Sequence, residues 1–296
     1  MASKVYFTKE ITPESLVRIY QVLSEEKALT GKIGIKISTG EQGGHNYLHP
    51  ELIGDLIKLT NGKLIENNTA YSGSRERTID HMKTIENHGF NTVGGVDILD
   101  GDGEEIKIPT RKGSIHLEYD IVGKGIERYD SILMLSHFKG HAMGGFGGAL
   151  KNMSIGLGSH NGKLWIHSAG RSIDERFVWR HLPPQDVFLE SMAEACSAVV
   201  DYMKNNIIYI NIANRLSVDC DCDSNPKEPE MGDLGIFAST DPVALDQACY
   251  DAVKNSPDPG KKALIKRMDS RHAIRTVEHA NELSLGCREY EIINID

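Results

Sequence analysis

Apolar and polar residues along this chain alternate in a pattern that predicts strands and helices in turn. Short, uninterrupted apolar runs are typical of buried strands, and apolar residues at every third or fourth position are typical of amphipathic helices. In the first third of the chain these patterns predict strands at 5–7, 32–37 and 63–66, and helices at 14–29, 50–60 and 74–89. Strands and helices in this order indicate a parallel sheet with helices on its faces.

The rest of the chain predicts the same architecture, with one antiparallel part. Residues 97–119 alternate around two glycines, which is typical of antiparallel hairpins. Residues 130–136, DSILMLS, form a continuous apolar run that predicts a central buried strand. Later patterns predict a helix at 187–204, strands at 207–212 and 234–238, and a helix that begins after Asp241-Pro242. We therefore predict an α/β fold with a largely parallel, Rossmann-like sheet, flanking helices and a smaller antiparallel β region.

The same pattern leaves the domain organisation open. A chain of 296 residues is long enough for one large α/β domain or for two lobes. A boundary at the end of the predicted central strand separates an N-terminal α/β lobe at 1–135 from a C-terminal α/β lobe at 136–296. A boundary near 171–185 and a single continuous domain are the alternatives, because composition does not shift enough to decide.

Composition and charge exclude several classes of protein. The formal charge of -9 argues against general nucleic-acid binding, which needs a basic face to neutralise phosphates. No apolar run reaches the roughly 18 residues of a membrane span, and the amino terminus has no signal-peptide pattern, so we expect a cytoplasmic protein without membrane association. Five cysteines at irregular spacings do not indicate a disulfide framework. The oligomeric state is open, and a homo-oligomer is one of the options.

The segment 136–163 concentrates more candidate chemistry than any other stretch. It follows the predicted central strand, and ligands of open α/β sheets bind at the carboxyl ends of strands. Its glycines alternate with large apolar residues, which predicts a packed loop shaped around a ligand rather than a flexible linker. Histidines can act as metal ligands or as acids and bases, and lysines can hold a carboxylate or phosphate. The candidate catalytic residues are His137, Lys139, His141 and Lys151.

Glycine amides of the same segment are candidates for holding an anion or a cofactor, because consecutive N–H groups can form a concave anion site. The alternative is that the polar residues of the loop are satisfied by backbone groups. A second loop at 38–49 also follows a predicted strand, and lining the site and forming an ordinary loop are equally compatible with its residues. The candidate cofactor-binding residues are Gly144, Gly145, Gly147, Gly148, Asn152, Glu41 and Asn46.

A pair of cysteines in the polar loop 217–233 lies one residue apart. Two thiolates at this spacing can share a soft metal, but they are only half of a four-ligand site, which Cys249 or histidines could complete. The pair is equally compatible with ordinary thiols. Asp221 and Asp223 should raise both thiol pKa values in the absence of a metal, which disfavours a free-thiolate nucleophile. The candidate metal ligands are His137, His141, Cys220 and Cys222.

Several motifs together resemble one known family over nearly the whole chain. These motifs are SHFKGHAMGGFGGALKNMSIG, CDCDSN and GDLGIFASTDPVALDQA, with SKVYF, GEQGGHNYLHP, YSGSRERTIDH and EHANELSLGCREYEI toward the ends. With them the chain is similar to domain-of-unknown-function family 362, often described as iron–sulfur-centre proteins. The resemblance implies no particular reaction, because the family has no general activity assigned to it.

The chain departs from the longer relatives at one place. Those relatives carry a ferredoxin-like insert with repeated CxxCxxC spacing shortly after a position that matches 167–170, whereas 171–185 of this chain contains no cysteine. We therefore expect no ferredoxin-type clusters in this chain, while an unknown transition metal or metallocofactor could still bind at the shared residues. The segment from His141 to Lys151 is also similar in kind, though not in spacing, to the glycine-rich segment around the nickel cofactor of the lactate racemase family.

The sequence thus favours a metal- or metallocofactor-dependent enzyme that acts on a small anionic substrate. In this reading His137 or His141 is a ligand or general base, and Lys139 and Lys151 hold the anion. The alternative is a non-catalytic protein that handles a metal, an iron–sulfur centre or a cofactor. Both functions need a metal, but only the enzyme needs a substrate pocket beside it. A third option is that no metal binds and the cysteines are structural.

Overall fold

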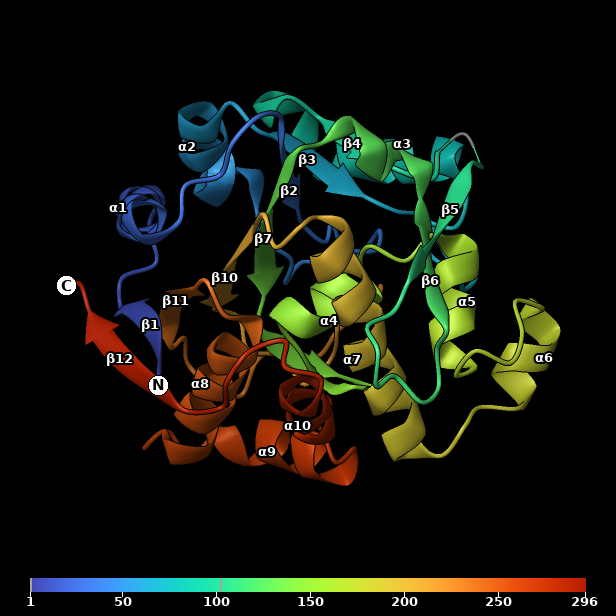
Figure 1. Cartoon of the computed structure of the whole chain (residues 1–296). Helices are drawn as coiled ribbons and strands as arrows, with labels where there is room; N and C mark the ends of the chain where they lie inside the picture. The colour runs from blue at the N-terminus through green and yellow to red at the C-terminus, as the bar shows by residue number, and fades with distance from the viewer. Residues whose placement is uncertain (1, 102) are drawn as a thin grey trace.

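An eight-stranded sheet forms the centre of the computed structural model, which describes residues 2–101 and 103–296 (Figure 1). Its strands follow the order β12-β1-β11-β10-β7-β2-β3-β4. Their bounds are β1 (Ser3–Thr8), β2 (Ile33–Lys36), β3 (Lys63–Glu66), β4 (Val96–Ile98), β7 (Ser131–His137), β10 (Ile207–Ala213), β11 (Gly235–Ser239) and β12 (Tyr290–Asn294). All neighbouring pairs are parallel except those of β11 with β10 and with β1. The predicted largely parallel sheet is confirmed.

Helices cover both faces of this sheet. The helices of the described residues are α1 (Pro13–Glu26), α2 (Pro50–Thr60), α3 (Thr78–Asn87), α4 (Ala149–Ser154), α5 (His160–His167), α6 (Glu175–Arg180), α7 (Gln185–Tyr202), α8 (Pro242–Asn255), α9 (Lys261–Ser270) and α10 (Arg275–Glu282), with short 3-10 turns at Phe90–Val93 and Lys124–Arg128. Of these, α6 packs on α5 and lies away from the sheet (Figure 1). Successive side chains of a strand point to opposite faces. In β7, Leu133 and Leu135 therefore join the core under α1 and α2, whereas Ile132 and Met134 join the core under α4, α7 and α8.

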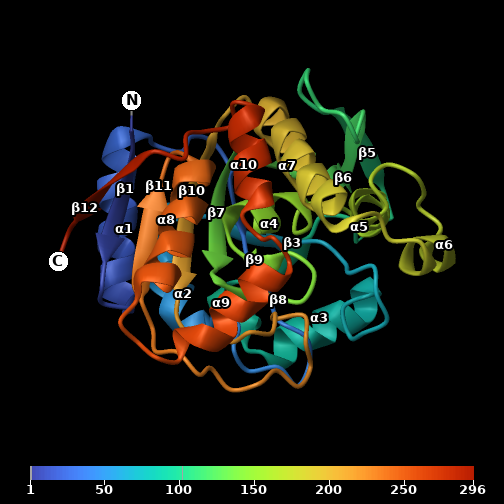
Figure 2. The same cartoon turned by 90° about the horizontal axis from the view of Figure 1, so that it is seen from below.

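Two small antiparallel sheets complete the fold. One is formed by β5 (Glu105–Pro109) and β6 (Tyr119–Gly123), as the alternating pattern before residue 120 predicts. The other, β8 (Lys139–His141) with β9 (Gly145–Gly147), lies inside the glycine-rich segment, beside α9 in Figure 2. Gly145 has a φ of +80°, and a Cβ there would lie 2.4 Å from that of Ala273, so only glycine fits this turn.

Strands from both halves of the chain belong to the one large sheet. A boundary at residue 135 would fall within β7, whose neighbours are β2 from the first half and β10 from the second. The first and last strands, β1 and β12, also pair in parallel, so the two ends of the chain lie at the same edge (Figure 1). Within the described residues, no helix combines the length and the apolar composition that crossing a membrane requires.

The strand order places a switch point between β2 and β7. From β2 the chain continues outward to β3 and β4, and from β7 it continues in the opposite direction to β10. Ligands of open α/β sheets bind where the order reverses, beyond the carboxyl ends of the strands. The last residues of the three strands nearest this point are Lys36 of β2, Glu66 of β3 and His137 of β7.

Candidate active site

A cavity of about 200 Å³ lies at this switch point. Lys36, Glu66 and His137 from the strand ends form part of its wall, and the glycine-rich segment and the cysteine loop form other parts. The lysine, arginine and carboxylate side chains that line the cavity are Lys36, Arg75, Lys139, Lys151, Lys163 and Glu66, so basic groups outnumber acidic ones. Among the described residues, the cavity wall therefore carries an excess of positive charge, which suits an anionic ligand.

Three predicted metal ligands meet in the wall of this cavity. His141 of β8 and two cysteines of the loop between β10 and β11, Cys220 and Cys222, each place a ligand atom so that all three atoms lie within 4.8 Å of one another. His141 and Cys220 are buried, and Cys222 is half-buried. Nζ of Lys151 in α4 lies 3.8 Å from Sγ of Cys220. We call His141, Cys220 and Cys222 the ligand trio.

The two thiols of the trio have different proton affinities. The hydrogen bond with Cys222 lowers the pKa of Cys220 well below its ordinary value, and Lys151 and His141 add to this effect against the cost of burial. The same hydrogen bond and burial raise the pKa of Cys222. The expectation that neighbouring aspartates raise both thiol pKa values is therefore wrong for Cys220, because Cys222, Lys151 and His141 lower its pKa. The Asp221 carboxylate pairs with His137 and Lys139 instead.

The His141 ring is held by backbone amides. Its Nδ1 accepts hydrogen bonds from the N–H groups of Gly144, at 2.8 Å, and Met143, at 3.3 Å. The neutral ring therefore carries its proton on Nε2. Burial, together with the nearby charge of Lys151, lowers the pKa of His141.

His137 lies apart from the trio. Its Nδ1 lies 2.8 Å from Oδ1 of Asp221, and its Nε2 lies 2.7 Å from the carbonyl oxygen of Asn214, so neither ring nitrogen is free for a metal in this conformation. Lys139 donates to Oδ2 of Asp221 at 2.6 Å and to the His137 carbonyl oxygen at 3.1 Å. Both residues line the cavity, but Asp221 already pairs with them.

Fewer backbone N–H groups of the glycine-rich segment are free to bind an anion than the sequence predicts. At the start of α4 the N–H groups of Ala149 and Leu150 donate to the carboxylate of Asp246 in α8, at 2.8 and 2.9 Å. The Gly144 amide donates to His141 instead of facing the cavity. Gly147 and Gly148 do line the cavity. An anion at this place would therefore depend on lysine side chains more than on a row of backbone amides.

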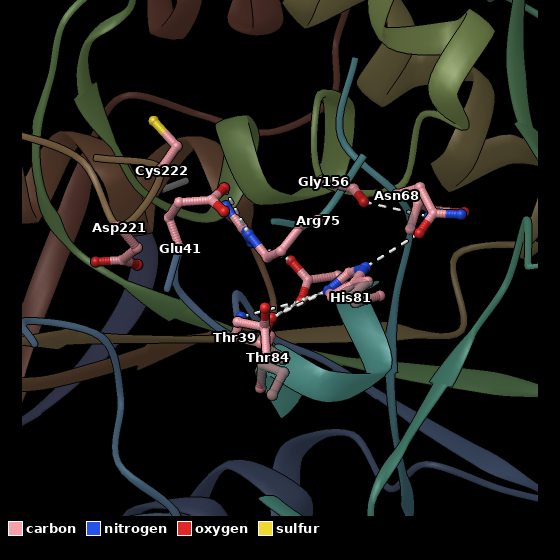
Figure 3. Close-up of polar contacts among 12 residues, drawn as sticks. Thr39, Glu41, Asn68, Arg75, His81, Thr84, Gly156, Asp221 and Cys222 are labelled. Carbon is pink, nitrogen blue, oxygen red and sulfur yellow. Dashed lines mark hydrogen bonds and ion pairs between the residues drawn. The ribbon is translucent and has the colours of Figure 1, made fainter. Parts of the chain in front are cut away.

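The two candidates of the loop 38–49 lie outside the cavity wall. Glu41 pairs with Arg75 at 3.4 Å and also accepts from Ser74 (Figure 3). Asn46 donates to the carbonyl oxygen of Lys227 at 3.5 Å. Asn152, in contrast, lines the cavity and bonds to Lys36.

A buried ion network centred on Arg75 supports the cavity wall, and Figure 3 shows Arg75 directed toward Glu41. Arg75 contacts Glu66 at 3.1 Å as well as Glu41, and it donates to the Tyr71 hydroxyl at 2.9 Å. Thr39 donates its N–H and hydroxyl to Glu66 at 3.0 and 2.6 Å. Burial by itself would raise the pKa of Glu66, but the hydrogen bond with His81 and the charge of Arg75 lower it well below its usual range.

The lowered pKa of Glu66 predicts a loss of stability in acid. A carboxylate with a depressed folded-state pKa contributes stability above the unfolded pKa of about 4.3, and this contribution disappears as pH falls below that value. The free energy of unfolding should therefore decrease below about pH 4.3, and Glu66→Gln should make this decrease shallower. Urea unfolding between pH 7 and 3 measures it. The exposed Glu86→Gln is the control, and an equal effect of both variants would contradict this prediction.

Sequence reasoning missed several titratable residues of the cavity wall, among them Lys36, Glu66, Arg75, Lys163 and His167. His167 donates from Nδ1 to the Lys163 carbonyl oxygen at 2.6 Å, and burial lowers its pKa to about 4, so the ring is neutral at pH 7 with Nε2 unprotonated. For Lys36 a signal was available, because a lysine inside the apolar run 32–37 is unusual for a buried strand. Arg75 stands in a polar stretch that does not single it out, whereas Lys163 ends the segment 136–163 that the sequence already favours as the site.

Comparison with known families identifies the class of this protein. The chain belongs to the family described as domain of unknown function DUF362, whose family model matches residues 33–251. The predicted membership is thereby confirmed. No curated protein matches this chain.

Two solved structures are similar to this chain at low sequence identity. The lactate racemase apoprotein from Thermoanaerobacterium thermosaccharolyticum is 12% identical, with a TM-score of 0.48 over 85% of this chain and 57% of that chain. A protein from Thermotoga maritima is 13% identical, with a TM-score of 0.45 over 84% of this chain and 60% of that chain. This chain thus spans less than two thirds of either protein.

Proposed function

We propose that this protein is a transition-metal-dependent enzyme that acts on a small anionic substrate. The observation that carries the proposal is the meeting of His141, Cys220 and Cys222 in the wall of a cavity whose charged side chains are mainly basic. A metal-handling protein without catalysis would need the ligand trio but not the cationic cavity beside it. The cavity therefore favours the enzyme.

The ligand trio suits a thiophilic metal ion. Two thiolates and one imidazole are the donors that zinc and similar transition metals prefer, and three protein ligands leave a coordination position for water or substrate. A metal bound there would supply a Lewis acid. Binding would displace the proton of Cys222 and would need a lone pair of the neutral His141 ring directed at the metal, so metal uptake should release protons and weaken as pH falls.

The basic side chains of the cavity wall divide into those with a carboxylate partner and those without one. Arg75 pairs with Glu41 and Glu66, and Lys139 pairs with Asp221. Lys151 and Lys163 form no ion pair with a carboxylate in the described part of the chain. These two lysines are therefore the cations that we assign to the anion of the substrate.

Metal analysis tests the proposal directly. Protein purified without oxygen should contain a transition metal, or should bind added Zn²⁺, Ni²⁺ or Fe²⁺ in about one-to-one ratio. Iron with acid-labile sulfide would instead indicate a cluster and support the non-catalytic alternative. Absence of bound metal after all three additions would overturn the proposal.

Replacing Lys151 with methionine should weaken anion binding about 10- to 150-fold, because a charge-assisted contact is worth about 1.5–3 kcal/mol. Methionine keeps most of the apolar stem, so the fold should persist. Thermal stabilisation by a panel of phosphate and small carboxylates measures the effect. Lys266→Met on the exposed face of α9 is the control. Equal anion affinity in Lys151→Met and the parent would remove Lys151 from the site.

A further inference from the structure

Lys36 is a buried lysine that the metal site does not use. It ends β2 at the switch point, only 1% of its surface is exposed, and it lines the cavity. Its Nζ has two hydrogen-bond acceptors, the carbonyl oxygen of Ile37 and, at 3.1 Å, Oδ1 of Asn152. In the described residues no carboxylate lies within ion-pair distance of Nζ.

The orientation of Asn152 is determined by its other contacts. Its Nδ2 faces three acceptors, namely the carbonyl oxygens of Lys36 and Leu135 at 3.2 and 3.3 Å and Oγ of Ser136 at 3.1 Å. The amide nitrogen must therefore point to these groups, and Oδ1 must point to Nζ of Lys36. Asn152 is thus a positioning residue for the amine.

Two acceptors fit a neutral amine better than an ammonium ion. A neutral amine has two N–H donors, which Ile37 and Asn152 accept, and its lone pair is left for the cavity that Lys36 lines. An ammonium ion would have a third N–H without an acceptor among the described residues. The geometry therefore favours the nucleophilic form of this lysine.

The charged groups near Lys36 also favour the neutral form of its amine. Lys151 of α4, Lys163 of α5 and Arg75 disfavour a further positive charge, and Glu66 of β3, which favours it, is already paired with Arg75. Burial and these cations lower the pKa of Lys36 to about 7. About half of the molecules would then carry the neutral amine at pH 7.

We propose that Lys36 forms an imine with a small 2-keto acid bound in this cavity. The inference rests on the proposed function only in that the cavity binds a small anion, and it does not require the metal. Nζ attacks the keto carbon, a C=N bond replaces the C=O bond, and the carbonyl oxygen leaves as water with the two amine hydrogens. A proton from solvent can then convert the imine to its iminium form.

Lys163 is the partner that we assign to the carboxylate of the keto acid. Its ammonium donates to the carbonyl oxygen of Gly158, which leaves further N–H donors for a ligand. Burial lowers its pKa to about 8, so Lys163 is still mostly charged at pH 7. A neutral amine and a charged ammonium in one cavity of about 200 Å³ fit a short chain with a carbonyl next to a carboxylate.

Reductive trapping tests the proposal on the full chain. The protein is incubated with pyruvate and cyanoborohydride at pH 7, and peptide mass mapping locates the N-carboxyethyl group that hydride reduction of the imine leaves. An ordinary lysine, with a pKa of about 10.4, is neutral in only about 0.04% of molecules at this pH. Lys36 should therefore be modified at least about tenfold faster than an exposed lysine such as Lys112. Equal rates, or an unmodified Lys36, would overturn the proposal.

The variant Lys163→Met tests the binding of the carboxylate independently of the reaction at the Lys36 amine. This variant keeps Lys36, and it should need about tenfold more pyruvate for half-maximal labelling, because a charge-assisted contact is lost. Labelling by acetaldehyde, which has no carboxylate, should change much less. If both reagents respond equally, Lys163 does not bind the carboxylate and the keto-acid assignment fails.

Labelling of Lys36 in protein without bound metal distinguishes this inference from the proposed metal-dependent function. Labelling of Lys36 should persist when the protein is treated with a chelator, and it should persist in Cys220→Ser, Cys222→Ser protein. Labelling without any metal binding would contradict the proposed metal enzyme but not the role of Lys36. Metal binding with no labelling of Lys36 would contradict the role of Lys36 alone.

Discussion

Protein in which both Cys220 and Cys222 are replaced by serine should lose its bound metal. The ligand atoms of these cysteines and of His141 lie within 4.8 Å of one another, so the double variant keeps one strong ligand of three. Serine hydroxyls are poor ligands for thiophilic metals at neutral pH. We expect the affinity for Zn²⁺ to fall by more than about 100-fold, measured by competition with a chromophoric chelator and by elemental analysis of anaerobically purified protein.

The chain supplies a matched control for this experiment. Cys287 is a half-buried thiol outside the ligand trio, so Cys287→Ser should keep the parent's metal content. Circular dichroism shows whether each variant is folded. If the folded double variant binds as much metal as the parent, or if neither binds any, the metal site does not exist as proposed.

Arg75→Met should destabilise the protein by about 3–5 kcal/mol, the cost of removing one partner from a buried ion pair. The guanidinium of Arg75 lies 3.1 Å from Glu66 and 3.4 Å from Glu41, and all three side chains are buried. Methionine fills part of the volume but leaves two buried carboxylates without a cation. Urea unfolding at pH 7 measures the change, provided that the transition is two-state.

Arg77 provides the comparison for this variant. It stands two residues away, is exposed and pairs only with Asp80 in the described residues, so Arg77→Met should change the stability by less than about 1 kcal/mol. Adding Glu66→Gln to Arg75→Met should cost less than the sum of the single changes, because the second change removes one of the unpaired charges. Similar losses for Arg75→Met and Arg77→Met would show that the network does not stabilise the fold.

The order of strands and helices was largely determined by the sequence itself. Residues 130–136 predict the central strand found as β7, and Asp241-Pro242 predicts the start of α8, where Asp241 accepts from the N–H of Val243 at 2.8 Å. Such features depend on apolar periodicity and on caps a few residues long, which a single segment contains. The C-terminal strand β12 was not predicted, because only pairing with β1 makes it a strand.

The local sequence pattern predicted the structure wrongly where residues distant in the chain bind the backbone. The helix predicted at 74–89 begins only at Thr78, since Ser74 and Arg75 belong to a loop whose groups contact Glu41 and Glu66. In the same way, the amides at the start of α4 are taken by Asp246, about a hundred positions later in the chain.

The sequence likewise predicted some features of the candidate site and not others. The residue types of the glycine segment and the cysteine pair identified His141, Lys151, Cys220 and Cys222 as candidates from sequence alone. That His141 meets both cysteines, while His137 pairs with Asp221, depends on which strand ends lie side by side. The neutral amine favoured at Lys36 likewise needs burial, Asn152 and the nearby cations together. Proton affinity and ligand geometry depend on neighbours in space, and only the tertiary structure decided which residues those are.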